Sequence, residues 1–171
     1  QYKEGNISEK DIKEILENAN FAPTHRLTQP WFFKVYQNES KLELAKSMVN
    51  HHKLLGNPKN VSIKEKKITE KCFQSNCIIA IFMNRDHAES IPEWEEVAST
   101  AMAVQNMWLT CVEKNIGCYW STPNYIQNMG DYFKLKQNQK CLGFFYMGKF
   151  NHVEKTATER NDIFDKTEWF K

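Results

Sequence analysis

Apolar residues recur along the chain with two different periods, and this alternation predicts a mixture of helices and strands. In residues 8–20, Ile12, Ile15 and Ala19 fall on one helical face, behind a Ser8 that can cap the helix. The same spacing predicts three more helices, over residues 39–55, 62–74 (opening at a capping Ser62) and 93–116.

Short runs of β-branched and aromatic residues predict four strands, over residues 31–36, 77–83, 119–122 and 141–147. The second and fourth runs are apolar throughout, so we expect both faces of these strands to be covered. Thr122 and Pro123 stand in the order that starts a helix after the third strand. Strands interleaved with helices indicate a single α+β or α/β domain over residues 1–171, without the G-x-G-x-x-G turn or P-loop of common nucleotide-binding folds.

The predicted helix 93–116 has little polar surface in its middle. A helix that is apolar nearly all round is buried in a core or an interface, and in a chain this short we expect it to pack against a second subunit too. Gly117 is expected to cap its C-terminal end. The last stretch, residues 149–171, is polar with an aromatic end, so we interpret it as an arm lying over its own body or over a partner.

Composition and charge argue against several classes of function. The net charge is +2, and the lysines of residues 64–67 are interrupted by Glu65, which favours a solvated helix face and gives no indication of nucleic-acid binding. Five cysteines without a C-x-x-C pair indicate reduced thiols in the cytoplasm, and no histidine stands at zinc-site spacing from them, so no metal site is expected. No signal peptide is visible, and the longest apolar run, residues 77–83, is too short to cross a membrane.

Two loops gather residue types that bind ligands. Residues 22–31 place hydroxyls, an imidazole, a guanidinium and an amide between a helix and a strand, although a capped turn with solvent-facing side chains explains them too. Residues 117–123 lead into a helix N-terminus, which either binds an anion through free N–H groups or is simply capped by Thr122. Lys149 and Arg160 are either anion clamps or surface charges.

Hydrolase signatures are absent, since the chain contains neither G-x-S-x-G nor H-E-x-x-H. Four segments in order resemble the nitroreductase family instead. They are Ala22–Trp31, which fits A-P-[ST]-x-x-x-x-Q-P-W; Glu93-Trp94 leading into Ala101–Asn106, which is similar to the long central helix; Ile116–Thr122, which fits G-x-x-W-x-[ST]; and Gly143–Gly148, which is similar to the last core strand. The likeness runs from about Ser8 to the C-terminus and is strongest to minimal members of the family.

This resemblance implies a three-layer α/β/α sandwich of the α+β class, with a mainly antiparallel sheet and a long central helix. It implies an obligate homodimer whose terminal arms, here about residues 149–171, pack on the partner. The cofactor would be FMN, bound at the interface. Hydride would pass from NADH or NADPH to flavin N5 and then to a nitroaromatic, a quinone or another small acceptor.

The resemblance also implies where the cofactor binds. His25 would contact FMN across the dimer, the turn after the third strand would also contact it, and Arg160 would face the phosphate. Since the flavin carries the hydride chemistry, no catalytic side chain and no metal are expected. The expected cofactor-binding residues are Phe21, His25, Arg26, Gln29, Trp120, Ser121, Thr122 and Arg160.

The chain departs from the family pattern by carrying less positive charge. Nothing in residues 1–7 matches the family's basic Arg-Ser-type start, which either lies upstream of Gln1 or is lost. Phe21 stands where minimal members can carry an arginine, and no arginine follows Trp120. These changes leave the choice of NADH or NADPH open, together with two alternative functions: a flavin-binding module without turnover, and a structural dimer that binds no flavin.

Overall fold

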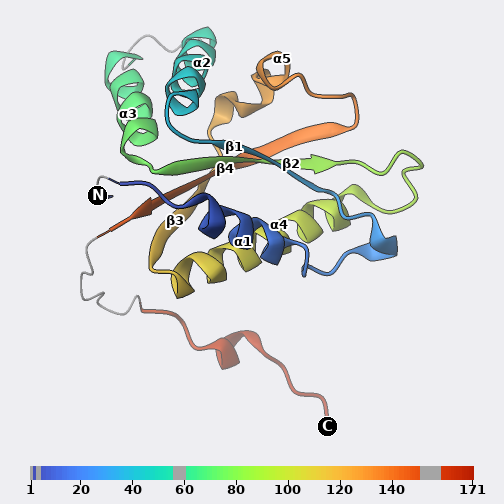
Figure 1. Cartoon of the computed structure of the whole chain (residues 1–171). Coiled ribbons are helices and arrows are strands. Elements are labelled where there is room, and N and C mark those ends of the chain that lie inside the picture. The colour runs from blue at the N-terminus through green and yellow to red at the C-terminus, as the bar shows by residue number, and fades with distance from the viewer. Residues whose placement is uncertain (1, 3–4, 56–60, 151–158) are drawn as a thin grey trace.

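The computed structural model describes residues 2, 5–55, 61–150 and 159–171. Within them, a four-stranded antiparallel sheet has the order β1-β2-β4-β3, formed by Trp31–Tyr36, Cys77–Asn84, Gln139–Lys149 and Ile116–Ser121. Helices cover both faces of this sheet (Figure 1). The expected three-layer α+β sandwich with an antiparallel sheet is therefore confirmed.

Strands β2 and β4 form the centre of the sheet, as their apolar sequences predict. The side chains of residues 77–83 in β2 have no exposed surface. Strand β4 extends two residues beyond the predicted run at each end, because the backbone still pairs there, Gln139 with Asn84 and Lys149 with Ile116.

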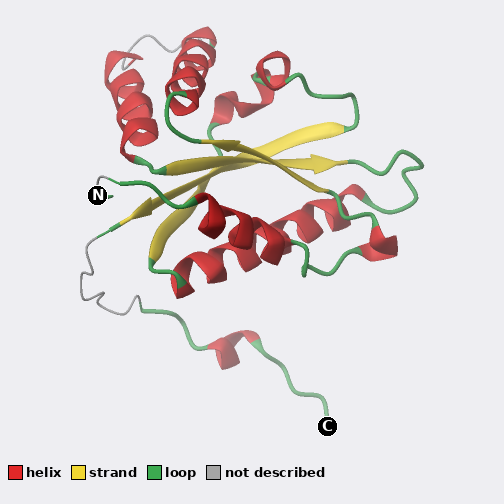
Figure 2. Cartoon of the chain, in the orientation of Figure 1, coloured by secondary structure: helices red, strands yellow, loops and turns green. Residues whose placement is uncertain are grey.

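One face of the sheet is covered by α1 (Glu9–Ala19) and α4 (Glu93–Glu113) (Figure 2). The Ser8 hydroxyl accepts the Asp11 backbone N–H at 3.1 Å, so the predicted N-terminal cap of α1 is confirmed. The Asn18 amide donates to the Thr110 hydroxyl at 2.9 Å and ties the two helices together.

The other face is covered by α2 (Ser40–Leu54), α3 (Val61–Gln74), the 3-10 helix η3 (Asn124–Asn128) and α5 (Gly130–Phe133). Each face of the sheet has its own apolar core, one centred on α1 and α4 and the other on α2, η3 and α5.

Three predicted helix ends are wrong by a few residues. Helix α4 stops at Glu113 rather than at residue 116, and Gly117 lies in β3 instead of capping the helix. Asn115, with φ 54°, takes the left-handed conformation that a C-terminal glycine usually supplies. Helix α3 begins one residue before Ser62. The helix expected at Thr122 is the short η3, with Pro123 at its N-cap.

The C-terminal stretch contains a 3-10 helix, η4 (Ile163–Lys166), and residues 159–171 are all exposed. This part of the arm extends away from the sandwich (Figure 1), so it does not lie over its own body. Residues 151–158 of the predicted arm lie outside the described residues.

Candidate functional site

The connection from α1 to β1, residues 20–30, forms the first candidate region and is called the η1 loop here. Its own side chains hold it together. The Thr24 hydroxyl accepts the Gln29 backbone N–H at 3.0 Å, and the Trp31 indole N–H donates to the Asn20 side-chain oxygen at 3.0 Å. The second bond joins the two ends of the loop.

The backbone of the η1 loop is strained at three positions. Arg26, Leu27 and Gln29 have φ values of 51°, 55° and 44°, in the left-handed region that residues other than glycine rarely adopt. Each such position costs on the order of 1–3 kcal/mol, and such positions cluster at ligand-binding sites. The strain therefore favours a binding role for this loop over a plain capped turn.

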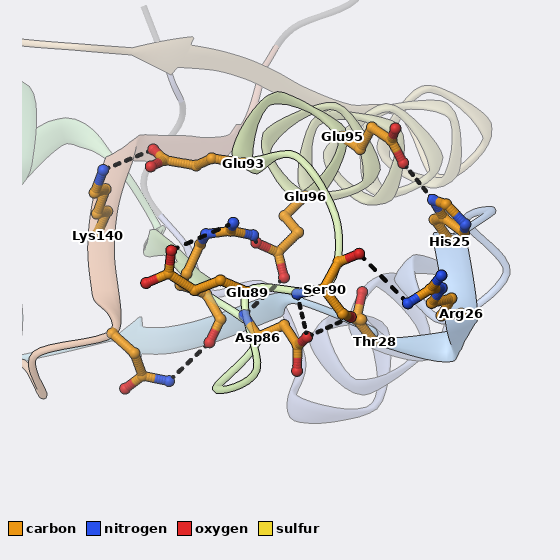
Figure 3. Close-up of polar contacts among 12 residues, drawn as sticks. His25, Arg26, Thr28, Asp86, Glu89, Ser90, Glu93, Glu95, Glu96 and Lys140 are labelled. Atoms are coloured by element: carbon orange, nitrogen blue, oxygen red, sulfur yellow. Dashed lines mark hydrogen bonds and ion pairs between the residues drawn. The ribbon is translucent and has the colours of Figure 1, made fainter.

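Two side chains fix the η1 loop to the start of α4 and to the turn that precedes it (Figure 3). His25 Nδ1 lies 2.5 Å from Glu95 Oε2, and the Arg26 guanidinium donates to the Ser90 carbonyl oxygen at 3.4 Å. His25 and Arg26 are exposed, so these contacts hold the two side chains in place while leaving them accessible at the surface.

The platform beneath these contacts is a buried carboxylate that the sequence analysis missed. Glu96 is fully buried, pairs with the Arg85 guanidinium and accepts the Asp86 backbone N–H at 2.8 Å. The Asp86 carboxylate in turn accepts the Ser90 backbone N–H at 3.1 Å and its hydroxyl at 2.7 Å (Figure 3). Two features of the sequence could have indicated this pair: Arg85 comes directly after a buried strand, and Glu96 is a glutamate in an apolar helix.

The end of β3 forms the second candidate region. The Trp120 indole N–H donates to the Leu142 carbonyl oxygen at 3.1 Å, and the ring lies against Gly143. Gly143 has φ 146°, and a Cβ there would lie 2.1 Å from the indole nitrogen. The glycine is thus required for this position of the ring.

Ser121 points to the opposite face of the sheet from Trp120, as the period of a strand requires. Its hydroxyl accepts a hydrogen bond from Lys71 Nζ of α3 at 3.1 Å. The same Nζ lies 4.6 Å and 4.4 Å from the ring centroids of Tyr119 and Tyr146. Burial lowers the pKa of Lys71.

The remaining expected site residues face outward. Phe21 is 79% exposed, Thr122 is exposed beyond the end of β3, and Arg160 is exposed in the C-terminal stretch. Within the described part of the chain, no hydrogen bond or ion pair links the η1 loop, the end of β3 and Arg160 to one another. One chain therefore presents three separate groups of expected site residues.

Several large apolar side chains are exposed on the surface of the described residues. They lie on α4, in the η1 loop and in the C-terminal stretch. They are Met102, Leu109, Val112, Phe21, Leu27, Phe164, Trp169 and Phe170. Met102, Leu109 and Val112 are spaced by seven and three residues and so share one exposed face of α4, and a shared apolar face of this kind favours an interaction surface.

The described residues contain no group of three or more His, Cys, Asp or Glu side chains that could hold a metal ion. All five cysteines are free. None of the helices in the described residues is long and apolar enough to span a bilayer.

Comparison with known proteins places this geometry in context. The model of the nitroreductase family matches residues 1–149. The chain is 23% identical over 141 residues to a protein of Escherichia coli strain K12 that is provisionally named NAD(P)H nitroreductase YdjA, covering 81% of this chain and 75% of that protein.

Solved structures share the fold. The nitroreductase-like family protein from Bacillus cereus superposes with a TM-score of 0.86 at 22% identity, covering 99% of this chain and 89% of its own. The FMN-dependent nitroreductase NfnB from Mycobacterium smegmatis, solved in complex with NADPH, superposes with a TM-score of 0.77 at 14% identity, covering 99% and 92%. The expected nitroreductase-like fold is confirmed.

Proposed function

This chain belongs to the nitroreductase family, and we propose that it is an FMN-dependent oxidoreductase that takes hydride from NADH or NADPH and passes it to a nitroaromatic, a quinone or another small acceptor. The observation that carries the proposal is the match to the family over residues 1–149. When bound, FMN would supply the hydride chemistry, accepting hydride at N5 and releasing it to the acceptor.

The described residues fit such a cofactor. A flavin site needs flat apolar surface, a few placed hydrogen-bond donors and a cation. At the end of β3, Ser121 supplies a hydroxyl and Lys71 a cation. In the η1 loop, Phe21 supplies an exposed ring, and His25 and Arg26 are held facing outward.

The protein's own task would be to bind and orient the cofactor and its substrates. The contact with Glu95 would hold the His25 ring in place through one ring nitrogen and leave the other nitrogen free to contact the cofactor. Ser121, Thr122 and the backbone around Trp120 would contact the cofactor from the sheet side. Gln29 lies in the same strained loop as His25, and Arg160 would face the phosphate.

We propose further that the molecule is a homodimer. The η1 loop and the end of β3 are not joined within one chain, and a second copy would bring the η1 loop of one protomer to the end of β3 of its partner. The exposed apolar side chains of α4 and of the C-terminal stretch support a partner surface. The arm, about residues 149–171, would pack on that partner. The five free thiols support a reducing compartment, as expected for the cytoplasm.

The test is the visible absorption spectrum of the protein after incubation with excess FMN and desalting, followed by NAD(P)H oxidation with a nitroaromatic acceptor. We expect retained flavin bands near one FMN per subunit and sustained turnover. Retained flavin without turnover would favour the passive flavin-binding module. A folded, dimeric but colourless protein would overturn the proposed function and favour the structural dimer.

A further inference from the structure

A cavity of about 250 Å³ is lined by residues of α2, α3 and η3. Helices α2 and α3 cover the face of the sheet opposite α4 (Figure 1). The cavity wall carries Lys64, Lys67 and Lys71 of α3, which occupy one helical face at spacings of three and four residues. The remaining polar lining includes Ser121, Tyr125 and His52. The cavity is thus lined by cations and hydrogen-bonding groups.

The charge of this cavity is not balanced by the protein. None of its lining residues is an aspartate or a glutamate. Among the ion pairs of the described residues, Glu65 pairs with Lys53 and Glu70 with Lys66, so neither carboxylate of α3 neutralises the cavity lysines. The three lysines line one cavity whose lining residues include no carboxylate, and an anion bound there would be attracted to all three.

Two buried side chains point to a ligand independently of the lysines. His52 is 7% exposed and Tyr125 is 5% exposed. Among the described residues, neither the ring nitrogens of His52 nor the hydroxyl of Tyr125 has a hydrogen-bond partner. Neither is sealed off from solvent, and both line the cavity, so their polar atoms are accessible from it. Because these atoms reach solvent, a ligand in the cavity can replace water as their hydrogen-bond partner.

Lys71 and Ser121 are arranged to assist the same ligand. The Ser121 oxygen accepts its hydrogen bond from Lys71, which leaves the hydroxyl proton free to be donated into the cavity. Burial raises the pKa of Tyr125, so its hydroxyl remains a donor at neutral pH. The set of donors and cations therefore suits an acceptor with several oxygens and more than one negative charge.

We propose that this cavity binds the phosphate monoester group of a small ligand. A phosphate dianion presents three acceptor oxygens and matches clustered lysines and hydroxyl donors. The volume suits such a group and a small attached body rather than a whole dinucleotide. The phosphate belongs to FMN, to the 2′-position of NADPH or to a separate ligand, and only the first two sources rest on the proposed function.

The test uses the full-length protein, with FMN bound if it retains FMN, and phenyl phosphate as the probe in isothermal titration calorimetry, with phenol as the neutral reference. Lys67→Gln removes one cavity cation, and Lys66→Gln makes the same charge change on the same helix outside the cavity, where Lys66 pairs with Glu70. We expect Lys67→Gln to weaken phenyl phosphate binding about tenfold, and Lys66→Gln to leave it unchanged.

Matched pairs of ligands that differ by one phosphate distinguish the three sources of the phosphate group. If Lys67→Gln weakens binding of FMN but not of riboflavin, the group is that of FMN. If it raises KM for NADPH but not for NADH, the group is the 2′-phosphate. If only phenyl phosphate binding falls, a separate ligand occupies the cavity. Lack of phenyl phosphate binding to both the flavin-free and the flavin-bound wild type, or equal loss in the two variants, would overturn the proposal. Flavin retention and turnover of the wild type test the proposed function separately.

Discussion

The η1 loop and the end of β3 are both expected to bind the flavin, yet they are built in opposite ways. The η1 loop lies outside the sandwich, is strained at three positions and is held by exposed polar contacts to Glu95 of α4 and to Ser90 in the turn before it. The end of β3 belongs to the sheet, with Trp120 packed on Gly143 and Ser121 bonded to Lys71.

This difference indicates how the two regions divide the work. The end of β3 is positioned by the core and is complete within one chain. The η1 loop gains little from burial in its own chain. Its strain is balanced by its internal hydrogen bonds, by the contacts of His25 with Glu95 and of Arg26 with Ser90 and, in the proposed dimer, by contacts to the partner. Changes at the two regions should therefore affect stability and function differently.

The largest effect is expected from Gly143→Ala. The added Cβ would lie 2.1 Å from the Trp120 indole nitrogen, at a backbone φ of 146° that other residues rarely adopt. Overpacking and backbone strain together should lower the free energy of unfolding by about 4 kcal/mol. Denaturant unfolding measures this change. Gly130→Ala, where nothing lies within 4 Å of the added Cβ, is the control and should change stability by less than about 0.5 kcal/mol.

A somewhat smaller effect is expected from Glu96→Gln, which removes the platform of the η1 loop. The Arg85 guanidinium, whose side chain is 15% exposed, would lose its buried partner, and stability should fall by about 3 kcal/mol. Hydrogen exchange should also speed up at the amides of residues 86–90. Glu93→Gln removes an exposed pair with Lys140 and should leave stability nearly unchanged. Equal losses in the two variants would contradict the role assigned to Glu96.

The third prediction separates stability from function at the η1 loop. Gln29→Gly relieves the left-handed φ of 44° at an exposed position, and should raise the free energy of unfolding by about 0.5–1 kcal/mol. The same change removes an expected FMN contact, so flavin affinity should fall while the melting temperature rises by about 1–4 °C. A variant that loses both stability and flavin would show that the backbone is not strained there.

The smallest effect is expected from thiol reagents on two buried cysteines of the sandwich, Cys72 and Cys77. Burial raises the pKa of Cys72 to about 11 and that of Cys77 to about 12. Because the thiolate is the reactive form, only about one molecule in a thousand or fewer is reactive at pH 8 at these positions. Mass-spectrometric mapping after iodoacetamide treatment should find both unmodified in the folded protein. Rapid labelling of either would mean that this part of the core opens readily.

Local sequence patterns predicted much of the sandwich. The strand Trp31–Tyr36 was predicted to the residue, and Ser8 caps α1 as expected. The end of α4 was wrong because Asn115 adopts a conformation usually taken by glycine, which moved Gly117 into β3. Whether Asn115 or Gly117 takes the left-handed conformation at the end of α4 is a local backbone preference that composition alone does not specify.

The candidate site was harder to predict because it depends on contacts between distant segments. The pairing of Arg85 with Glu96 requires the turn between β2 and α4 to be known. The lysines of residues 64–67 were interpreted as a solvated face, and Lys64 and Lys67 are indeed exposed. Their relation to Tyr125 and Ser121 emerges only once η3 packs beside α3.

The central claim, that the η1 loop of one protomer and the end of β3 of its partner form one flavin site, is tested most directly by complementation. His25→Ala removes a contact from the η1 loop, and Thr122→Trp blocks the end of β3 from an exposed position. Each variant alone should lose most of its NAD(P)H oxidation. When the two are co-expressed, half of the dimers are mixed and each carries one intact site, so about a quarter of the wild-type activity should return. Activity no higher than the average of the two separate variants, although the mixed dimer forms, would contradict a site shared between protomers.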